Sequence, residues 1–509
     1  MDQRPNLVFI HTDHQAFYQW QDYAAKPARP NFDRVARQGI EFKNAYCASP
    51  LCAPTRRSLL TGLYPHTHKN FYNHDQAPYE HATYLDLLNG AGYKNYYFGK
   101  WHAGDGDASD HHCEGISMPG YGNPYTHPDY IDYLKQNNLQ EATIKITHVL
   151  GWEEWGYGQP GYAGEHLVEG NENYHQHSPF GCGEFAAGTM LTPNETHEAF
   201  YLANRACEAL RNIEAEGDNA IPFSLRVDFW GPHQPYFPTQ EYLDMYKDVD
   251  FPEYPSWDSK LVGKPKIYHT EASMPMGKNK QLIIPNARPW SYYEDLMRHC
   301  AAHITMVDAA AGIVLDQLER SGLIDNTLVI FTTDHGDALA CHGGHFDKGS
   351  YMPQEILRIP MAMMYSGQIQ PGQTTDAPVN SVSVPVTLLD AAGLEFPHKV
   401  HGKSLLRLVQ ETEADWPDYV VTEFRGNGYH DKLPSRAIIQ GKYKYVSYLD
   451  KDNIDELYDL EQDKYEMNNL AYDEHYSKVK TGLRRLLLSW QKDTDDDVDY
   501  EWANNPAQV

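Results

Sequence analysis

Short apolar runs alternate with longer amphipathic stretches along most of this 509-residue chain. The runs are rich in β-branched and aromatic residues, which is typical of strands that are buried on both faces. They cover Leu7–Thr12, Tyr93–Phe98, Phe223–Phe229, Leu328–Thr333 and Ile359–Met364. The alternation predicts an α/β fold, in which a large, mostly parallel sheet is sandwiched by helices. Ligands of such sheets bind at the carboxyl ends of the strands, so functional residues are expected there.

Two of the intervening stretches show clear helical periodicity. From about Tyr292 to Ser321, apolar residues recur every three or four positions, and Gly322 is a suitable C-cap. A second helix is expected from about Glu198 to Glu214. Helices of this length can cover one face of the predicted sheet.

Two changes in composition divide the chain. The segment from about residue 105 to 195 is rich in Gly, Tyr, His, Asn and Pro and shows little periodicity of apolar residues. This composition predicts a loop-rich insertion. Long ordered loops are often functional. We expect the catalytic α/β domain to span residues 1–408 and residues 409–509 to form a small C-terminal α+β subdomain.

The predicted subdomain has its own strand and helix signals. Ala437–Gln440 and Tyr443–Tyr448 are expected to form antiparallel strands on either side of the turn at Gly441 and Lys442. A helix is expected over about Ser477–Asp493. The acidic end of the chain that follows, up to Asp499, is expected to be solvated and frayed.

The overall charge limits the partners of the chain. Lys and Arg total 42 and Asp and Glu total 70, which gives a net charge of −28. So acidic a chain is a poor binder of nucleic acids and of anionic membranes, and an anionic substrate would need a local cluster of cations. No apolar run approaches the roughly 18 residues that span a bilayer. No signal peptide is recognisable, so a cytoplasmic location is expected. If a leader has been removed from the sequence, the protein could instead be periplasmic or secreted.

The seven cysteines are scattered and include no CxxC pair, so neither a disulfide framework nor a structural zinc site is indicated. Tyrosine is abundant, with 37 residues. These side chains could pack in half-buried positions or could provide stacking surfaces for sugars.

Two segments that follow predicted strands have the composition of metal-binding loops. Asp13 and His14 come after the first strand, and Asp334 and His335 come after the strand Leu328–Thr333. Carboxylates are hard donors that favour Ca²⁺ or Mg²⁺, whereas imidazole nitrogens favour Mn²⁺ or Zn²⁺. Either aspartate alone could equally cap a helix, but the occurrence of both at strand ends favours a shared metal site.

A third segment places a cysteine where an anion would be held. Pro54 suits the first turn of a helix, which would put Cys52 at the positive helix end and Arg56 one turn further on. The alternative is a buried free cysteine beside a structural arginine.

This third segment resembles the C-x-P-x-R…T-G signature of the sulfatase family, within the alkaline-phosphatase superfamily, through Cys52, Pro54, Arg56, Thr61 and Gly62. Further segments resemble family motifs in the same order: Gly99–Gly104 (GKWHxG), Pro232–Pro235 (PHxP), Asp334–Gly336 (DHG), Lys348–Gly349 with Glu355 (KG…E), Leu457–Leu460 and Asn468–Leu470 (ELYDL…NNLA). The matches cover most of the chain outside the insertion. The resemblance implies an alkaline-phosphatase-like fold and a sulfuric-ester hydrolase.

The resemblance also implies a modified nucleophile. A separate formylglycine-generating enzyme would oxidise Cys52 to formylglycine, which hydrates to a gem-diol. In the family, one hydroxyl of the diol, activated by the metal, attacks sulfur and the alcohol departs. The second hydroxyl then expels sulfate and restores the aldehyde.

Other roles carry over position by position. The implied metal ligands are Asp13, Asp334, His335 and the modified Cys52. Arg56 would hold the hydrate, and Lys100 and Lys348 would bind the sulfate oxygens. His102 would be the base that collapses the sulfated intermediate, and His233 the acid that protonates the leaving alcohol, because a near-neutral pKa suits both tasks.

The chain departs from the family pattern at His14, where many sulfatases have a second aspartate and others a glutamine. We keep His14 as a metal ligand, since an imidazole can still bind through one nitrogen. Ca²⁺ is the favoured metal, with Mn²⁺ or Mg²⁺ as alternatives. His345 and Asp347, beside Lys348, could line the substrate pocket or stabilise their loop.

The leading hypothesis is removal of sulfate from a sulfated carbohydrate, although a small aryl or alkyl sulfate is also compatible with the motifs. The carbohydrate prediction depends on rings in the insertion, which could instead pack the insertion itself: Trp152, Trp155, Tyr157, Tyr162, Tyr174, His175 and His177. One alternative is a phosphonate monoester or phosphodiester hydrolase of the same superfamily, whose members often lack the second aspartate. Another is a non-catalytic binding protein on this scaffold.

Overall fold

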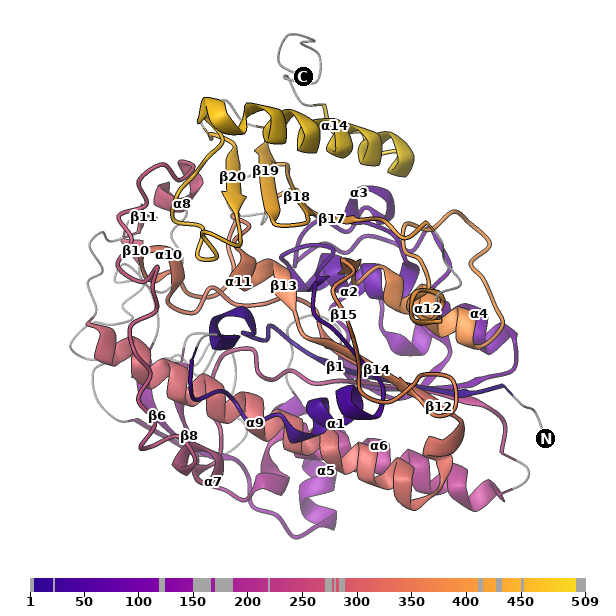
Figure 1. Ribbon diagram of the computed structural model, residues 1–509. Coiled ribbons are helices and arrows are strands. Elements are labelled where there is room, and N and C mark those ends of the chain that lie inside the picture. Colours follow the sequence, from indigo (N-terminus) through magenta and orange to yellow (C-terminus); the bar gives the residue numbers. More distant parts are fainter. Residues whose placement is uncertain are drawn as a thin grey trace.

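A computed structural model describes residues 4–21, 23–118, 124–149, 166–169, 186–217, 220–270, 277–278, 281–282, 289–410, 415–426, 433–449 and 453–499. At its centre lies an eight-stranded sheet flanked by helices on both faces (Figure 1). The strand order is β15-β2-β14-β12-β1-β9-β4-β5. The bounds are β1 Asn6–Thr12, β2 Ile40–Phe42, β4 Lys94–Lys100, β5 Cys113–Met118, β9 Phe223–Asp228, β12 Thr327–Thr333, β14 Met361–Tyr365 and β15 Gln373–Thr375.

The sheet is mostly parallel, as the alternation of strands and helices predicted. Strands β12, β1, β9, β4 and β5 run parallel to one another. The exception is β14, which lies antiparallel to both β12 and β2. The predicted strand Ile359–Met364 is therefore present, but it runs against its neighbours.

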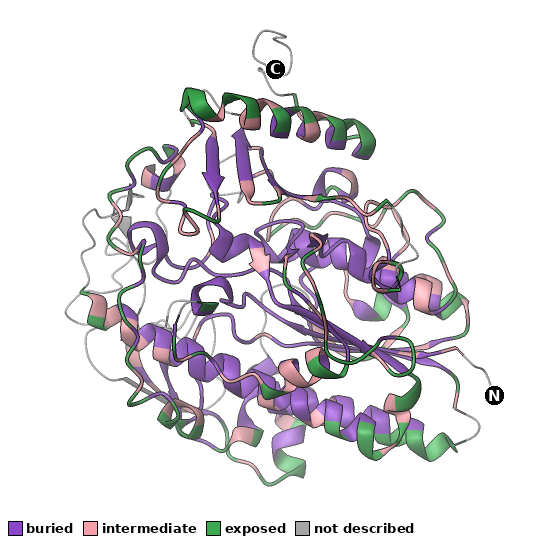
Figure 2. Ribbon diagram, in the orientation of Figure 1, coloured by how far each residue is buried: buried purple, intermediate pink, exposed green. Residues whose placement is uncertain are grey.

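The two faces of the sheet carry separate apolar cores. In β1, Val8 and Ile10 pack toward α1 (Pro30–Gln38), α6 (Glu198–Glu216) and α9 (Trp290–Arg320). Leu7 and Phe9 of the same strand pack toward α2 (Cys52–Thr61), α4 (Tyr84–Gly90) and α12 (Ser383–Ala391). Successive side chains of a strand point to opposite faces, so burial on both sides requires the nearly continuous apolar runs seen in the sequence. Figure 2 shows these central strands as buried along their length.

The two predicted helices are present with close to the expected bounds. Helix α9 ends at Arg320, and Gly322 adopts a left-handed conformation just beyond it (φ 71°). Helix α6 begins at Glu198 and ends at Glu216.

The described part of the predicted insertion contains more regular structure than the composition indicated. Strand β5 extends the large sheet, and β6 (Thr143–Val149), β7 (His166–Glu169) and β8 (Ala186–Met190) form an antiparallel sheet beside α5 (Pro128–Gln136). The aromatic and histidine residues singled out between 152 and 177 lie outside the described residues.

The described residues of 415–426, 433–449 and 453–499 form a second layer above the large sheet (Figure 1). The antiparallel strands β17 (Tyr419–Phe424), β18 (Ser435–Gln440), β19 (Tyr443–Tyr448) and β20 (Glu456–Asp459) are covered by α14 (Ser477–Thr494). The hairpin around Gly441 and the final helix agree with the sequence prediction. The boundary at residue 408 stays a prediction, since side chains of β17 also join the core of the α/β layer.

The remaining α-helices and strands of the described chain are smaller. They are α3 Pro65–His68, α7 Gln240–Asp244, α8 Ile267–Thr270, α10 Cys341–Gly344, α11 Gln354–Leu357, α13 Leu405–Val409, β3 Ala45–Tyr46, β10 Gly277–Lys278, β11 Gln281–Leu282, β13 Arg358–Ile359 and β16 Val379–Asn380. No helix in the described ranges is long and apolar enough to cross a membrane. None of the cysteines in these ranges forms a disulfide.

The acidic end of the chain is partly anchored, in contrast to the frayed tail that we expected. Arg436 of β18 is buried, and its Nε and Nη2 lie 2.9 Å and 2.8 Å from the two carboxylate oxygens of Asp496. A buried guanidinium needs a counter-charge, and Asp496 supplies it.

Candidate active site

Helix α2 presents Cys52 at its positive end. The helix begins at Cys52 with Pro54 in its first turn, and Gly62 in the left-handed conformation (φ 69°) ends it. No side chain caps the N-terminus at Leu51, although the backbone N–H of Ala53 donates to Asn73 Oδ1 over 3.1 Å. Cys52 is fully buried. Helix N-termini favour negative charge, so the position suits the binding of an anionic group.

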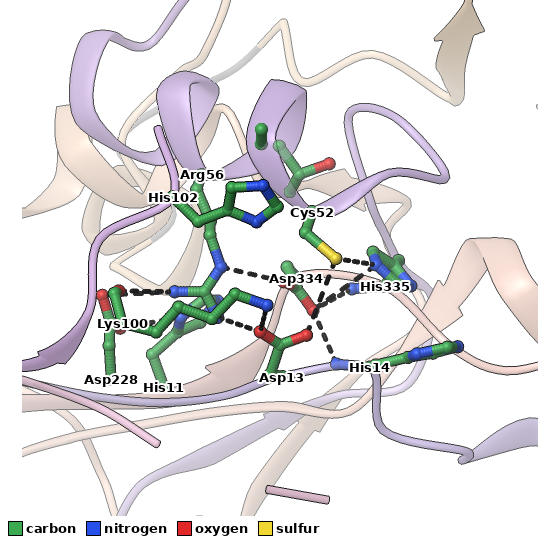
Figure 3. A network of polar contacts seen from close by, with 12 residues as sticks. His11, Asp13, His14, Cys52, Arg56, Lys100, His102, Asp228, Asp334 and His335 are labelled. Carbon is green, nitrogen blue, oxygen red and sulfur yellow. Dashed lines mark hydrogen bonds and ion pairs between the residues drawn. The ribbon is translucent and has the colours of Figure 1, made fainter. Parts of the chain in front are cut away.

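The pairing of β1 with β12 brings the two predicted halves of the metal site together. Thr12 lies opposite Thr333 in the parallel register, so Asp13 and Asp334 leave the sheet side by side. One potential ligand atom from each of Asp13, Cys52, Asp334 and His335 lies within 4.8 Å of the others. Figure 3 shows these four side chains converging below the start of α2.

The tautomer of His335 suits metal binding. Its Nδ1–H donates to the carbonyl of Gly336 over 2.8 Å, so the lone pair lies at Nε2. That nitrogen lies 3.1 Å from the sulfur of Cys52, which in turn lies 3.7 Å from Oδ1 of Asp13. Histidines that bind metals commonly donate their second N–H to a carbonyl in this way.

Two buried cations balance the two carboxylates. Arg56 donates from Nε to Asp334 over 3.1 Å and from Nη2 to Asp13 over 2.9 Å, and Lys100 forms an ion pair with Asp13. Burial alone would raise the pKa of Asp13, but Lys100 and Arg56 hold it well below its usual value. Two carboxylates and one imidazole lone pair are donors that fit a divalent metal. Their charge is already balanced, so a metal would leave the site positive and ready for an anionic substrate.

His14 lies at the edge of this group. Its backbone N–H donates to Oδ1 of Asp334 over 2.8 Å. Its ring centre lies 4.7 Å from that of His335 and 4.6 Å from that of His233, and its Nε2 lies 3.5 Å from Oδ2 of Asp337. The ring is not part of the four-residue group, so its role as a metal ligand stays a prediction.

Lys348 reaches the site beside His233. Its Nζ lies 3.3 Å from Nε2 of His233, 3.4 Å from Nδ1 of His14 and 3.1 Å from Oδ1 of Asp347. The Nδ1–H of His233 donates to the carbonyl of Gln234 over 2.6 Å, so Nε2 carries the lone pair. Burial, followed by the charge of Lys348, lowers the pKa of His233 well below its usual value. The near-neutral pKa that we expected for an acid is therefore absent before an anion binds.

His102 lies above Lys100 in the same group of side chains (Figure 3). Its Nε2–H donates to the carbonyl of Asn73 over 2.6 Å, which puts the proton-accepting lone pair at Nδ1. Burial lowers the pKa of His102 well below its usual value, so the ring is neutral near pH 7. A neutral ring is the form that a general base requires.

The sequence analysis missed Asp228, which stands behind Arg56. Its carboxylate lies 2.8 Å from Nε of Arg226, 2.7 Å from Nδ1 of His11 and 3.6 Å from Nη1 of Arg56, and it accepts the hydroxyl proton of Tyr97. All five side chains are buried. Asp228 is the last residue of β9, so the rule that located Asp13 and Asp334 at strand ends also points to it.

A protein-family model described as Sulfatase matches residues 5–394 of this chain. The chain belongs to the sulfatase family. A second model, described as the C-terminal region of N-sulphoglucosamine sulphohydrolase, matches residues 341–493. The chain is therefore a sulfuric-ester hydrolase, a class that in general uses a divalent metal and formylglycine.

Individual relatives agree with the family. The chain is 28% identical to an uncharacterised sulfatase, YidJ, of Escherichia coli over 99% of this chain and 90% of the relative. It is 26% identical to an N-acetylglucosamine-6-O-sulfatase of Bacteroides thetaiotaomicron over 97% of this chain and 87% of the relative.

The fold extends beyond sulfatases. A solved phosphonate monoester hydrolase of Silicibacter pomeroyi has a TM-score of 0.73 and 21% identity, over 97% of this chain and 96% of that chain. At this identity the likeness concerns the fold.

Proposed function

We propose that this sulfatase removes sulfate from a sulfated saccharide, with Cys52 as the nucleophile precursor and Ca²⁺ as the metal. The observation that carries the proposal is the convergence of Asp13, Cys52, Asp334 and His335 in one buried group. Bound there, a divalent metal would withdraw charge from a sulfate oxygen and lower the pKa of a nearby hydroxyl. Conversion of Cys52 by a formylglycine-generating enzyme would supply that hydroxyl.

The chain's own cations would bind the sulfate group. Lys100 forms an ion pair with Asp13, Lys348 lies beside His233, and Arg56 donates to Asp13 and Asp334. Fixed cations in a buried site stabilise negative charge that develops on equatorial oxygens without needing to reorganise. In its present form the Cys52 thiol is a poor nucleophile, because burial raises its pKa.

Two histidines would move protons. The lone pair at Nδ1 of His102 would accept the proton when the sulfated intermediate collapses. His233 would donate from Nε2 to the leaving alcohol once the negative charge of a bound sulfate offsets Lys348, because that charge raises the pKa of the imidazole.

The saccharide is proposed because a relative that matches almost the whole chain is an N-acetylglucosamine-6-O-sulfatase. The phosphonate hydrolase alternative rests on the shared fold and on His14 in place of a second aspartate.

Peptide mass spectrometry over Leu51–Arg56 tests the nucleophile, using protein produced together with a formylglycine-generating enzyme. We expect a peptide lighter than the cysteine form that reacts with an aldehyde reagent. An unmodified Cys52 under these conditions would contradict the proposed nucleophile.

Assays of the converted protein on sulfated N-acetylglucosamine, an aryl sulfate, a phosphodiester and a phosphonate ester test the substrate. We expect the highest kcat/KM on the sulfated sugar. Turnover of the phosphonate faster than every sulfate would favour the alternative, and binding without any turnover would favour a non-catalytic protein.

A further inference from the structure

A second group of buried metal-ligating side chains lies outside the catalytic centre. His197 and Glu198 stand at the start of α6, and His303 stands in the middle of α9, the helix that packs against α6. One potential ligand atom of each lies within 4.8 Å of those of the other two. The three residues are only 3%, 4% and 3% exposed.

Several polar atoms of this group have no partner. Oε2 of Glu198 and both ring nitrogens of His303 are buried and make no hydrogen bond within the described part of the chain. Buried polar atoms are normally paired, because an unpaired one retains the full cost of leaving water. Three such atoms on two adjoining side chains therefore indicate a missing binding partner.

The charges around Glu198 show what kind of partner is missing. Burial raises its pKa to about 8, with the backbone N–H of Gly231 opposing this and the negative charge of Asp13 adding to it. No cationic side chain of the described residues forms an ion pair with it. Burial also lowers the pKa of His303 to about 3, so this ring is neutral and has a lone pair to donate.

We propose that His197, Glu198 and His303 bind a divalent transition metal ion, separate from the metal of the catalytic centre. Two imidazoles with one carboxylate are a typical ligand set for Zn²⁺, Mn²⁺ or Fe²⁺. Ca²⁺ takes six to eight oxygen ligands, so this group would select against it. On binding, Glu198 releases its proton to solvent and becomes the one anionic ligand.

The required rearrangement is small. Tetrahedral metal–ligand bonds of about 2.0–2.2 Å place neighbouring ligand atoms about 3.3–3.6 Å apart, so ligand atoms that lie within 4.8 Å of one another would approach by at most about 1.5 Å. His197 currently accepts the N–H of Ala199 at Nδ1 over 3.2 Å. Coordination through Nε2 moves the ring proton to Nδ1 and exchanges this capping bond for the metal bond.

The site is connected to the catalytic centre through Gly231. The N–H of Gly231 donates to Glu198, and its carbonyl accepts the N–H of Asp13 over 3.1 Å. His303 approaches so closely that a Cβ at Gly231 would lie 2.9 Å from its Nε2. A metal in this group would therefore fix the short segment that leads from Gly231 to His233.

Metal stoichiometry provides the test, with Co²⁺ as the probe. Chelator-treated full-length protein is dialysed against Co²⁺, and bound metal is measured by mass spectrometry together with the visible absorption of Co²⁺. Asp334→Asn removes the catalytic centre, and Glu198→Gln or His303→Gln removes the proposed site. His299→Gln, one helical turn before His303, is the matched control.

We expect Asp334→Asn to retain one equivalent of Co²⁺ and the double variant Asp334→Asn/Glu198→Gln to bind none. His303→Gln should lose the same equivalent as Glu198→Gln, and His299→Gln should lose nothing. Complete loss of Co²⁺ in Asp334→Asn, or unchanged stoichiometry in Glu198→Gln and His303→Gln, would overturn the proposal.

Crystals of the wild-type protein soaked in Co²⁺ decide the matter if the variants do not fold. An anomalous difference peak between His197, Glu198 and His303 supports the site. A peak confined to Asp13, Asp334 and His335 overturns it.

Discussion

The ammonium nitrogen of Lys348 lies 3.3 Å from Nε2 of His233, so the proposed sulfate-binding cation and the proposed leaving-group acid are direct neighbours. This relationship couples substrate binding to the protonation of His233. Burial and the positive charge of Lys348 lower the pKa of His233 in the free protein. An anion bound to Lys348 would offset that positive charge and raise the pKa of His233 again.

Replacing Lys348 with methionine should separate the contribution of this lysine to sulfate binding from its effect on the pKa of His233. We expect kcat/KM for a sulfate ester to fall about 10²- to 10³-fold, because a cation on the transferring group is lost. The basic limb of the pH profile of kcat/KM should move to higher pH, because the pKa of His233 rises when the neighbouring charge is removed. Steady-state rates across a pH series measure both.

Lys399→Met is the control for this substitution, because Lys399 is 64% exposed and pairs with Asp495 near the end of α14. An equal loss of activity in Lys399→Met, or a basic limb that moves to lower pH in Lys348→Met, would contradict the assignment.

Asp228 should be essential for stability. Replacing it with asparagine leaves Arg226 buried beside His11 with no full counter-charge. We expect the free energy of unfolding to fall by about 3–5 kcal/mol, measured by denaturant titration. Asp316→Asn, which breaks an exposed pair with Arg34, should cost less than about 1 kcal/mol. Similar losses in both variants would show that Asp228 has no special role.

His66 should make stability depend on pH. Its Nδ1 donates to Glu423 over 2.5 Å and its Nε2 to the carbonyl of Thr494 over 2.9 Å, so the ring is held as an imidazolium. Burial would lower its pKa, but Glu423 raises it above the usual value. The stabilisation is therefore complete below the unfolded pKa of about 6.5 and is lost as pH rises through the folded pKa.

Denaturant titrations on both sides of this range measure the effect, which has a slope of at most about 1.4 kcal/mol per pH unit. His66→Gln should be less stable than wild type at low pH and should lose this part of the slope. His475→Gln is the control, because that ring is 89% exposed. If the free energy of unfolding of His66→Gln depends on pH as steeply as that of the wild type, the folded protein does not hold His66 as an imidazolium.

Metal removal should abolish activity reversibly. A chelator should remove the ion from Asp13, Asp334 and His335, and Ca²⁺ should restore the rate if oxygen ligands dominate the site. Asp334→Asn should stay inactive after Ca²⁺ is added, because it lacks a charged ligand and a partner of Arg56. Activity that survives exhaustive chelation would exclude an essential metal.

The sequence predicted the central strands of the large sheet better than the strand at its edge. Strands β1 and β12 were recognisable because burial on both faces forces apolar runs, and Asp13 and Asp334 stood out as charges at the ends of those runs. Strand β5 was missed because Cys113–Met118 lies at the sheet edge, where its half-exposed positions need no apolar run. Its pairing with β4 is decided by tertiary contact.

Some site features depend on distances that a sequence does not show. The near-neutral pKa expected for His233 was wrong because the burial of the ring and the approach of Lys348, 115 residues away, set its protonation. The anchoring of Asp496 by Arg436 likewise joins residues 60 apart. The group of His197, Glu198 and His303 gave no recognisable spacing, because α6 and α9 are separated along the chain and meet only in the fold.

The pairing of β1 with β12 also sets an order of events during synthesis. Cys52 leaves the ribosome early, but the pocket that encloses it requires Asp334 and Lys348, roughly 300 residues later, which takes about 15–60 s at ordinary translation rates. Throughout that interval the thiol lies on an unfinished chain that a modifying enzyme can reach. Closure of the sheet buries it completely. We therefore expect the proposed conversion of Cys52 to precede the folding of the second half of the chain.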